Sequence, residues 1–162
     1  MDQLRLVFEN LKVRDIMRTP VITIFSDENL SDALIKFSSF NVSHLVVIDR
    51  GHRLVGLFSH KYLYRTQSPR KVIGDDVLYD PGLMTDGADG LYDKSALDCY
   101  ILEHVMKKNP YYLHPEDKLS KALIDMAQKN LACIPIVDEK MKVKGLVTDH
   151  DILLYLAGIL EE

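Results

Sequence analysis

The chain has 162 residues, the length of one ordinary domain, and its 47% hydrophobic and 27% charged residues are typical of a globular protein with a single core. The formal net charge is −4 and no block of Lys and Arg residues stands out, which argues against nucleic acid as a partner. No stretch has the apolar run of a signal peptide or a membrane span, and two cysteines fit a reducing compartment, so we expect a cytoplasmic protein without a membrane partner.

In chain order, the pattern of residues 13–63 returns without a gap at residues 102–152. Met17 recurs 89 positions later as Met106. The same offset relates Leu30-Ser31 to Leu119-Ser120, Ala33-Leu34-Ile35 to Ala122-Leu123-Ile124, Asn41 to Asn130, and Gly56-Leu57 to Gly145-Leu146. A constant offset over so many positions indicates an internal duplication. Two copies of one unit commonly bury each other's apolar faces, so we expect pseudo-twofold symmetry, with any site between the copies.

The residue pattern of each copy predicts a short helix, a strand, an amphipathic helix, two more strands and a closing helix. Asn41 and Asn130 follow the amphipathic helices, and asparagine tolerates the left-handed conformation of helix ends. The two later strands are solid apolar runs, as in strands covered on both faces. They span 45–49 and 53–58 in the first copy, and 134–138 and 142–147 in the second. Ser59 and Thr148 are suitable N-cap residues for the closing helices.

Residues 66–94, between the copies, contain half of the glycines and six aspartates. This composition is typical of a long, mobile linker. Its segment 86–90 lacks the alternating oxygen ligands of an EF-hand calcium loop, so a solvated linker is the preferred interpretation. We therefore divide the chain into a first repeat with an N-terminal helix (1–65), an acidic linker (66–94) and a second repeat (95–162).

Two motifs of the second copy resemble those of CBS domains, a family named for cystathionine β-synthase. Residues 145–152, Gly-Leu-Val-Thr-Asp-His-Asp-Ile, resemble its nucleotide-binding signature, in which a strand ends at Ser or Thr and an Asp follows three residues later in a helix. Residues 134–138, Ile-Pro-Ile-Val-Asp, resemble the preceding apolar strand. The duplication resembles the CBS pair, or Bateman module. This resemblance implies an α+β fold of two pseudo-symmetric CBS repeats, each a helix followed by β-α-β-β-α, packed through their sheets into one globular module.

The same resemblance implies a regulatory module that binds an adenine nucleotide, such as AMP, ADP or ATP, or another adenosine-containing ligand between its repeats. It also implies a homodimer that acts on an unidentified target protein. The alternative is a ligand-free dimerisation and assembly module. An enzyme is the weakest hypothesis, because the sequence offers no nucleophile with a base, no catalytic acid–base pair, no metal site and no cofactor motif.

The CBS signature implies that Thr148 and Asp151 contact the ligand. A helix N-terminus offers unpaired backbone N–H groups, the Thr148 hydroxyl suits a phosphate or ribose oxygen, and the Asp151 carboxylate suits two ribose hydroxyls. The alternative is that Thr148 only caps the helix and Asp151 only complements the helix dipole. In the first copy Tyr62 occupies the position of the aspartate, and a phenol cannot accept two ribose hydroxyls, so we expect an asymmetric module.

The resemblance also implies that the first strand and the second-strand entrance of the first copy face Asp151. The implied residues are Thr23 and Ile24, with Val42, Ser43 and His44 beside the base. In one interpretation a charged His44 reaches a phosphate. In the other, His44 is a strand-edge histidine that is hydrogen-bonded to the backbone.

Overall fold

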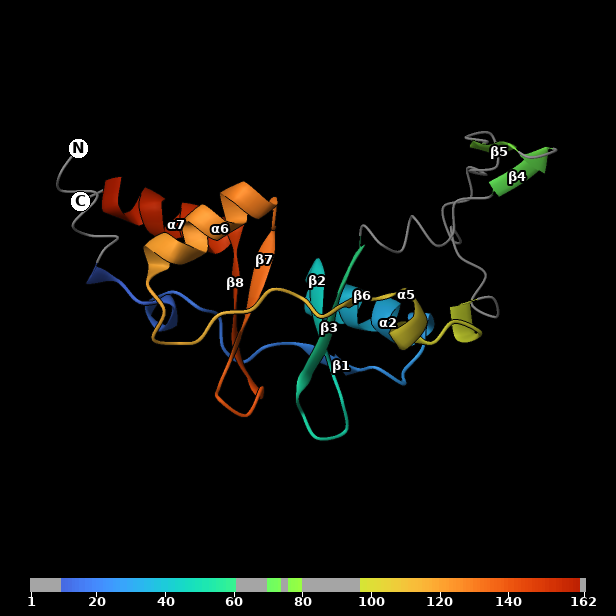
Figure 1. Cartoon of the computed structure of the whole chain (residues 1–162), viewed down its shortest axis with the longest axis horizontal. Helices are drawn as coiled ribbons and strands as arrows, with labels where there is room; N and C mark the ends of the chain where they lie inside the picture. The colour runs from blue at the N-terminus through green and yellow to red at the C-terminus, as the bar shows by residue number, and fades with distance from the viewer. Residues whose placement is uncertain (1–9, 61–69, 74–75, 80–96, 161–162) are drawn as a thin grey trace.

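A computed structural model describes residues 10–60, 70–73, 76–79 and 97–160 of the chain (Figure 1). The first repeat contains η1 (Val13–Asp15), β1 (Thr23–Phe25), α2 (Leu30–Phe40), β2 (His44–Ile48) and β3 (Leu54–Ser59). The second contains α5 (Leu102–Val105), β6 (Lys107–Lys108), α6 (Leu119–Lys129), β7 (Cys133–Val137), β8 (Val143–Thr148) and α7 (Asp149–Leu160). Among these residues, no helix is both long and apolar enough to cross a lipid bilayer.

The duplication seen in the sequence is repeated in the strand register. Val46 of β2 pairs with Leu57 of β3, and the equivalent pair in β7 and β8 is Pro135 and Leu146. Each hairpin also has an irregularity at the same place, after Val47 and after Ile136. The order of the larger sheet is β1-β2-β3-β6, with β1 parallel to β2, whereas β7 and β8 form a two-stranded sheet. The predicted α+β fold of two similar repeats is confirmed.

Both amphipathic helices end as the sequence predicts. Asn41 closes α2 with a φ of 49°, and Asn130 closes α6 with a φ of 52°. Each asparagine donates its backbone N–H to a carbonyl of the last turn, that of Phe37 or Met126. Asparagine occupies this left-handed conformation more readily than most residues, so it ends both helices and turns the chain into the following strand.

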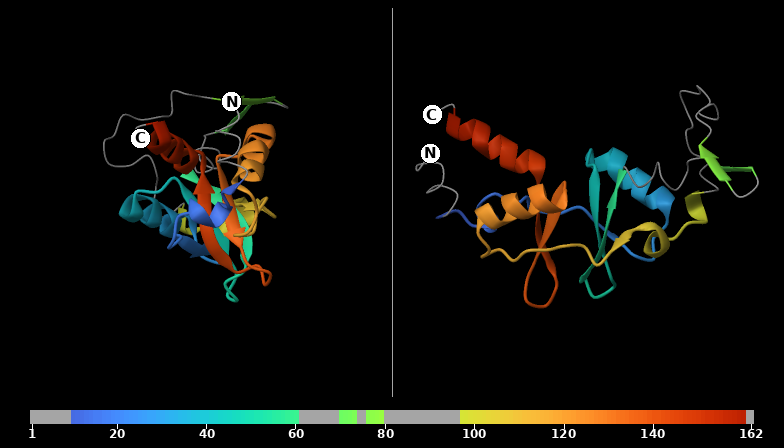
Figure 2. Two further views of the ribbon diagram at one scale, coloured as in Figure 1. Left: turned by 90° about the vertical axis from the view of Figure 1, so that its left-hand side faces the viewer. Right: turned by 45° about the horizontal axis from the view of Figure 1, so that its top comes forward.

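The two repeats meet through their hairpins. Figures 1 and 2 show β2–β3 and β7–β8 next to each other in the middle of the molecule, with the helices outside. The residues buried between the hairpins come from both repeats: Val46, Ile48, Leu54, Leu57, Cys133, Val137 and Leu146. The apolar runs predicted as doubly covered strands therefore have one face toward their own helices and the other toward the partner repeat.

The short helices are exchanged between the repeats. Val13 of η1 is fully buried in the core of the second repeat, and Leu102 of α5 is fully buried in the core of the first. The Val13 N–H donates to the carbonyl of Asp117 and the Leu102 N–H to that of Glu28, both at 2.9 Å. In Figure 1 the blue segment at η1 accordingly lies beside α6, and the yellow α5 beside α2. Each core thus includes a short helix from the other repeat. The domain boundaries 1–65, 66–94 and 95–162 stay a prediction.

Part of the predicted linker has regular structure. Strands β4 (Arg70–Ile73) and β5 (Asp76–Tyr79) form an antiparallel hairpin in which Arg70 pairs with Tyr79. No element was expected here, because the high content of glycine and aspartate around these strands favours a linker. The rest of residues 66–94 lies outside the described residues, as does Tyr62.

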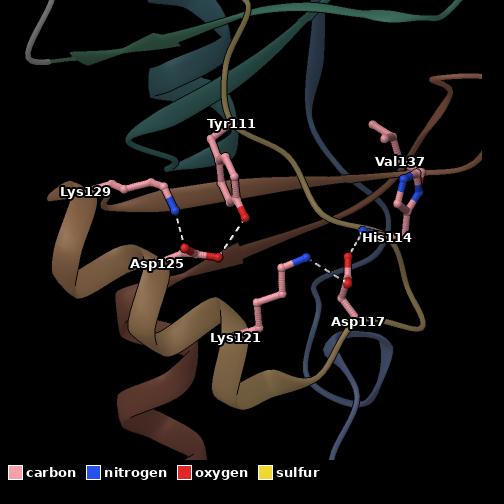
Figure 3. A network of polar contacts seen from close by, with 7 residues as sticks. All are labelled: Tyr111, His114, Asp117, Lys121, Asp125, Lys129 and Val137. Carbon is pink, nitrogen blue, oxygen red and sulfur yellow. Dashed lines mark hydrogen bonds and ion pairs between the residues drawn. The ribbon is translucent and has the colours of Figure 1, made fainter.

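A polar network joins the loop before α6 to the helix itself (Figure 3). The Tyr111 hydroxyl donates to Asp125 at 2.7 Å, and Lys129 pairs with the same carboxylate and lies over the tyrosine ring. The hydrogen bond to Asp125 is the main reason why the pKa of Tyr111 rises to about 12. In the loop before α6, Asp117 accepts hydrogen bonds from the His114 backbone N–H and from the Lys121 side chain. Tyr111 is therefore held against α6.

Candidate functional site

Two clefts lie between the repeats, and the 89-residue offset relates them. The first, of about 400 Å³, is called the Thr148 cleft and is lined by Arg18, Pro20, Val21, Ile22, Asn41, Val42, Ser43, His44, Leu146, Thr148, Asp149 and His150. The second, of about 450 Å³, is called the Ser59 cleft and is lined by Ser43, His44, Leu57, Ser59, His60, Lys107, Asn130, Leu131, Ala132 and Cys133. Apart from the shared Ser43 and His44, every residue of the Ser59 cleft has its equivalent in the Thr148 cleft.

Thr148 is the last residue of β8 and directly precedes α7. Its backbone N–H and hydroxyl donate to Asp151 Oδ2 at 2.9 and 2.7 Å, and the Asp151 N–H donates back to the Thr148 hydroxyl at 3.2 Å. This reciprocal arrangement is a capping box, with aspartate in the place of the usual glutamate. Thr148 thus caps the helix, as in the alternative that the sequence left open, and Asp151, for which that alternative was an interaction with the helix dipole, completes the cap. That role keeps Thr148 in the wall of the cleft and fixes Asp151 directly behind it.

Asp151 is buried, and its second oxygen is paired with Arg18. The pair joins Asp151 Oδ1 to Arg18 Nε, and the Arg18 side chain is itself half exposed in the cleft. Sequence reasoning missed Arg18, because it lies in the irregular segment between η1 and β1. The duplication could have pointed to Arg18, because the equivalent residue of the second copy, Lys107, is also basic. In the structure Lys107 lines the other cleft.

The opposite wall of the Thr148 cleft comes from the first repeat. Val42, Ser43 and His44, at the entrance of β2, lie in this wall. Thr23 and Ile24 do not line it: Ile24 is 1% exposed within the core of its repeat, and the Thr23 carbonyl accepts a hydrogen bond from Lys36. Strand β1 pairs with β2 from Thr23 onward, and its central residue, Ile24, is directed into the core. The segment before the strand, Pro20 to Ile22, lines the cleft instead.

His44 borders both clefts. Burial lowers its pKa, and the Asp149 carboxylate only partly opposes that shift. Its Nδ1 lies 3.3 Å from the Ser43 hydroxyl. A lowered pKa favours the neutral ring near neutral pH, so His44 is suited to hydrogen bonding with a base or a hydroxyl. The interpretation of His44 as a charged phosphate ligand requires acid conditions.

The Ser59 cleft differs in its charges. His60 replaces Asp149, Lys107 replaces Arg18 and Cys133 replaces His44, so no carboxylate is among its described lining residues. Burial raises the pKa of the Cys133 thiol to about 12, and such a thiol stays protonated and is a poor nucleophile. Tyr111, the equivalent of Ile22, is bound to Asp125 and is not part of this wall.

Nothing in the described part of the chain gathers three His, Cys, Asp or Glu side chains into a group that could hold a metal ion. The Thr148 cleft combines an apolar wall with the N-terminus of α7, the Arg18 guanidinium and the Asp149 carboxylate, and Asp151 is buried behind Thr148.

The CBS domain family model matches residues 13–68 and 102–158, which is more than half of the chain. The L-aspartate semialdehyde sulfurtransferase of Methanocaldococcus jannaschii is 23% identical over 146 residues, which cover 90% of this chain and 23% of that protein. The chain spans about a quarter of the length of several curated relatives that it matches.

Two of the solved structures that this chain resembles contain bound ligands. The CBS domain pair of protein MJ0100, in complex with 5′-methylthioadenosine and S-adenosyl-L-methionine, has a TM-score of 0.69 and 22% identity, covering 91% of this chain and 97% of that one. CBSX2 in complex with AMP has a TM-score of 0.69 and 20% identity, covering 93% and 98%. At this level of identity the likeness is one of fold.

Proposed function

The chain belongs to the CBS domain family, and we propose that it is a regulatory module that binds an adenosine-containing ligand in the Thr148 cleft without transforming it. The observation that carries this proposal is that Thr148, from the second repeat, meets Val42, Ser43 and His44, from the first, around one cavity of about 400 Å³. A cavity of this size suits a nucleoside or nucleotide. The adenosine compounds bound by MJ0100 and CBSX2 support the same class of ligand.

Each part of such a ligand has a suitable partner in the cleft. The apolar side chains of Val21, Ile22 and Val42 suit the flat face of adenine. The N-terminus of α7 carries partial positive charge and Arg18 lines the same cleft, and both suit a phosphate. Asp151, one turn into the helix, suits the ribose hydroxyls once its present partner is displaced. AMP, ADP and ATP are therefore the first candidates.

A regulatory role follows from the fact that the two walls of the cleft belong to different repeats. A ligand that contacts both repeats favours the arrangement of the repeats in which both sets of contacts form, so its binding energy shifts a conformational equilibrium. We propose that a separate target protein responds to this shift. We place this module in the cytoplasm as part of the same proposal.

A second candidate function, assembly without a ligand, is favoured by the exposed apolar side chains of the helices. Ile35 and Ile124, at equivalent positions of α2 and α6, are 56% and 52% exposed. Phe40, Leu123, Leu153 and Leu154 are exposed as well. Apolar surfaces of this kind mark interaction sites. Related surfaces on both repeats suit a homodimer with twofold symmetry, which we propose for either function.

A thermal-shift screen separates the two candidates. The compounds are AMP, ADP, ATP, NAD, S-adenosylmethionine and 5′-methylthioadenosine, each with the wild-type chain. A compound at about 100 times its dissociation constant should stabilise the folded state by roughly 2.7 kcal/mol. If none of the six raises the melting temperature at millimolar concentration, the ligand-binding proposal is wrong and assembly becomes the leading function.

A further inference from the structure

Asp151 has both carboxylate oxygens engaged within the protein. Oδ2 accepts two hydrogen bonds from Thr148, at 2.9 and 2.7 Å, and Oδ1 is paired with Arg18. A ribose diol needs acceptor positions on this carboxylate. A carboxylate has about four such positions, and three are already filled, so a diol that donates both of its hydroxyls to Asp151 has to displace one of the two partners.

Arg18 is the partner that can be displaced. The Thr148 hydrogen bonds belong to the start of α7, so breaking them would open the helix cap. The Arg18 side chain is 52% exposed, against 7% for Asp151, so it can rotate into solvent while the carboxylate stays in place. The Arg18 backbone is fixed by two hydrogen bonds to Leu146, of 2.9 and 3.2 Å, so only the side chain has to move.

We infer that Arg18 determines the specificity of the Thr148 cleft, by covering Asp151 until a ribose displaces it and then pairing with a phosphate of the same ligand. This inference rests on the proposed function and adds phosphorylated nucleosides as the preferred class. In this exchange the guanidinium leaves one anion for another and can bind the phosphate with two N–H groups, while the Asp151 carboxylate receives hydrogen bonds from the ribose hydroxyls in place of Arg18. A nucleoside without phosphate breaks the same ion pair and offers no anion in return.

The exchange has no counterpart in the Ser59 cleft. Lys107 occupies the position of Arg18, but residue 62 is a tyrosine where Asp151 stands in the second repeat. The arginine and the carboxylate thus occur together on only one side of the pseudo-twofold axis.

Calorimetric titration with two probes, AMP and adenosine, tests the inference. The wild-type chain should bind AMP more tightly than adenosine. Arg18→Ala should weaken AMP binding by about tenfold or more, as expected for a lost charge-assisted contact. The same variant should bind adenosine as tightly as the wild type or more tightly, because the ion pair no longer competes. Arg14→Ala, which removes an arginine paired with Glu116 outside the cleft, should leave both affinities unchanged.

Equal weakening of AMP and adenosine by Arg18→Ala would contradict the inference, because it would show that Arg18 only holds the site in shape. Unchanged affinities for both probes would contradict it as well. If the wild type binds neither probe, the proposed function loses support, and the ion pair is tested without a ligand. The Arg18 Nε–H resonance in a ¹H–¹⁵N spectrum should shift on Asp151→Ala. An unshifted resonance would overturn the inference regardless of any ligand.

Discussion

The Sδ atom of Met17 lies over Gly145, where a side chain on that residue would begin. An ideal Cβ at Gly145 would be 2.4 Å from Met17 Sδ and 2.8 Å from its Cγ. The equivalent pair on the other side of the molecule is Met106 and Gly56, where the Cβ–Sδ distance would also be 2.4 Å. These contacts hold each exchanged short helix against the hairpin of the opposite repeat.

We predict that Gly145→Ala destabilises the protein by about 1–3 kcal/mol, as overpacking of a close contact does. The methionine cannot relieve the clash by moving only its tip, because its Cβ is also within 3.0 Å of the added carbon. Urea unfolding measures the change. Gly158→Ala is the matched control: its added Cβ meets nothing within 4 Å and lies in α7, so it should stabilise the chain by up to about 1 kcal/mol. Equal stability changes in the two variants would contradict the packing.

The exchange of short helices predicts that the halves stay together when the chain is cut between them. We expect that a protease site inserted within residues 80–96, once cleaved, leaves two fragments that elute together from a sizing column. The reason is that η1 is buried in the core of the second repeat and α5 in that of the first. Fragments that separate without denaturant would show that the repeats are independent domains.

Acidification should destabilise the protein through His44. Burial lowers the pKa of His44 from 6.5, with partial opposition from Asp149, so the unfolded chain binds a proton more readily than the folded one. The His44 contribution to the free energy of unfolding is therefore complete above about pH 6.5 and declines as the pH falls toward the lowered pKa.

We expect urea unfolding at about pH 7 and about pH 5 to show a smaller loss of stability in His44→Gln than in the wild type. Asp149→Asn should enlarge the loss, because Asp149 is the group that raises the pKa of His44. Arg18, His60 and Lys107 also line the clefts beside His44, and they remain in both variants. The same pH dependence in His44→Gln and in the wild type would contradict this assignment.

The sequence was sufficient for the repeat, for the amphipathic helix and the following strand pair of each copy, and for the ends of α2 and α6, because these depend on local patterns. Asn41 and Asn130, for example, have a clear conformational preference that local sequence reveals. The exchange of η1 and α5 was not predictable in this way. A helix of three or four residues has an apolar face, but its sequence does not say which of two similar cores buries it.

The same limit applies within the Thr148 cleft. Thr148 and the entrance of β2 were found because they belong to a motif and to its repeat. Arg18 has no periodic pattern, and its meeting with Asp151 depends on the exchanged packing that places Met17 on Gly145. Whether Pro20 to Ile22 or Thr23 and Ile24 line the cleft depends on where β1 begins to pair with β2. The ends of strands and helices are the part of a structure that a sequence predicts least well.

The asymmetry between the clefts is tested most directly by titrating the compound that stabilises the wild type most into two variants, Asp151→Asn and Tyr62→Phe. Asparagine keeps an oxygen for the Thr148 cap but removes the charge. If the ligand binds in the Thr148 cleft, Asp151→Asn should weaken it at least about tenfold, the worth of one charge-assisted hydrogen bond, while Tyr62→Phe leaves the affinity unchanged. Equal weakening by both substitutions, or none from Asp151→Asn, would contradict binding at Asp151.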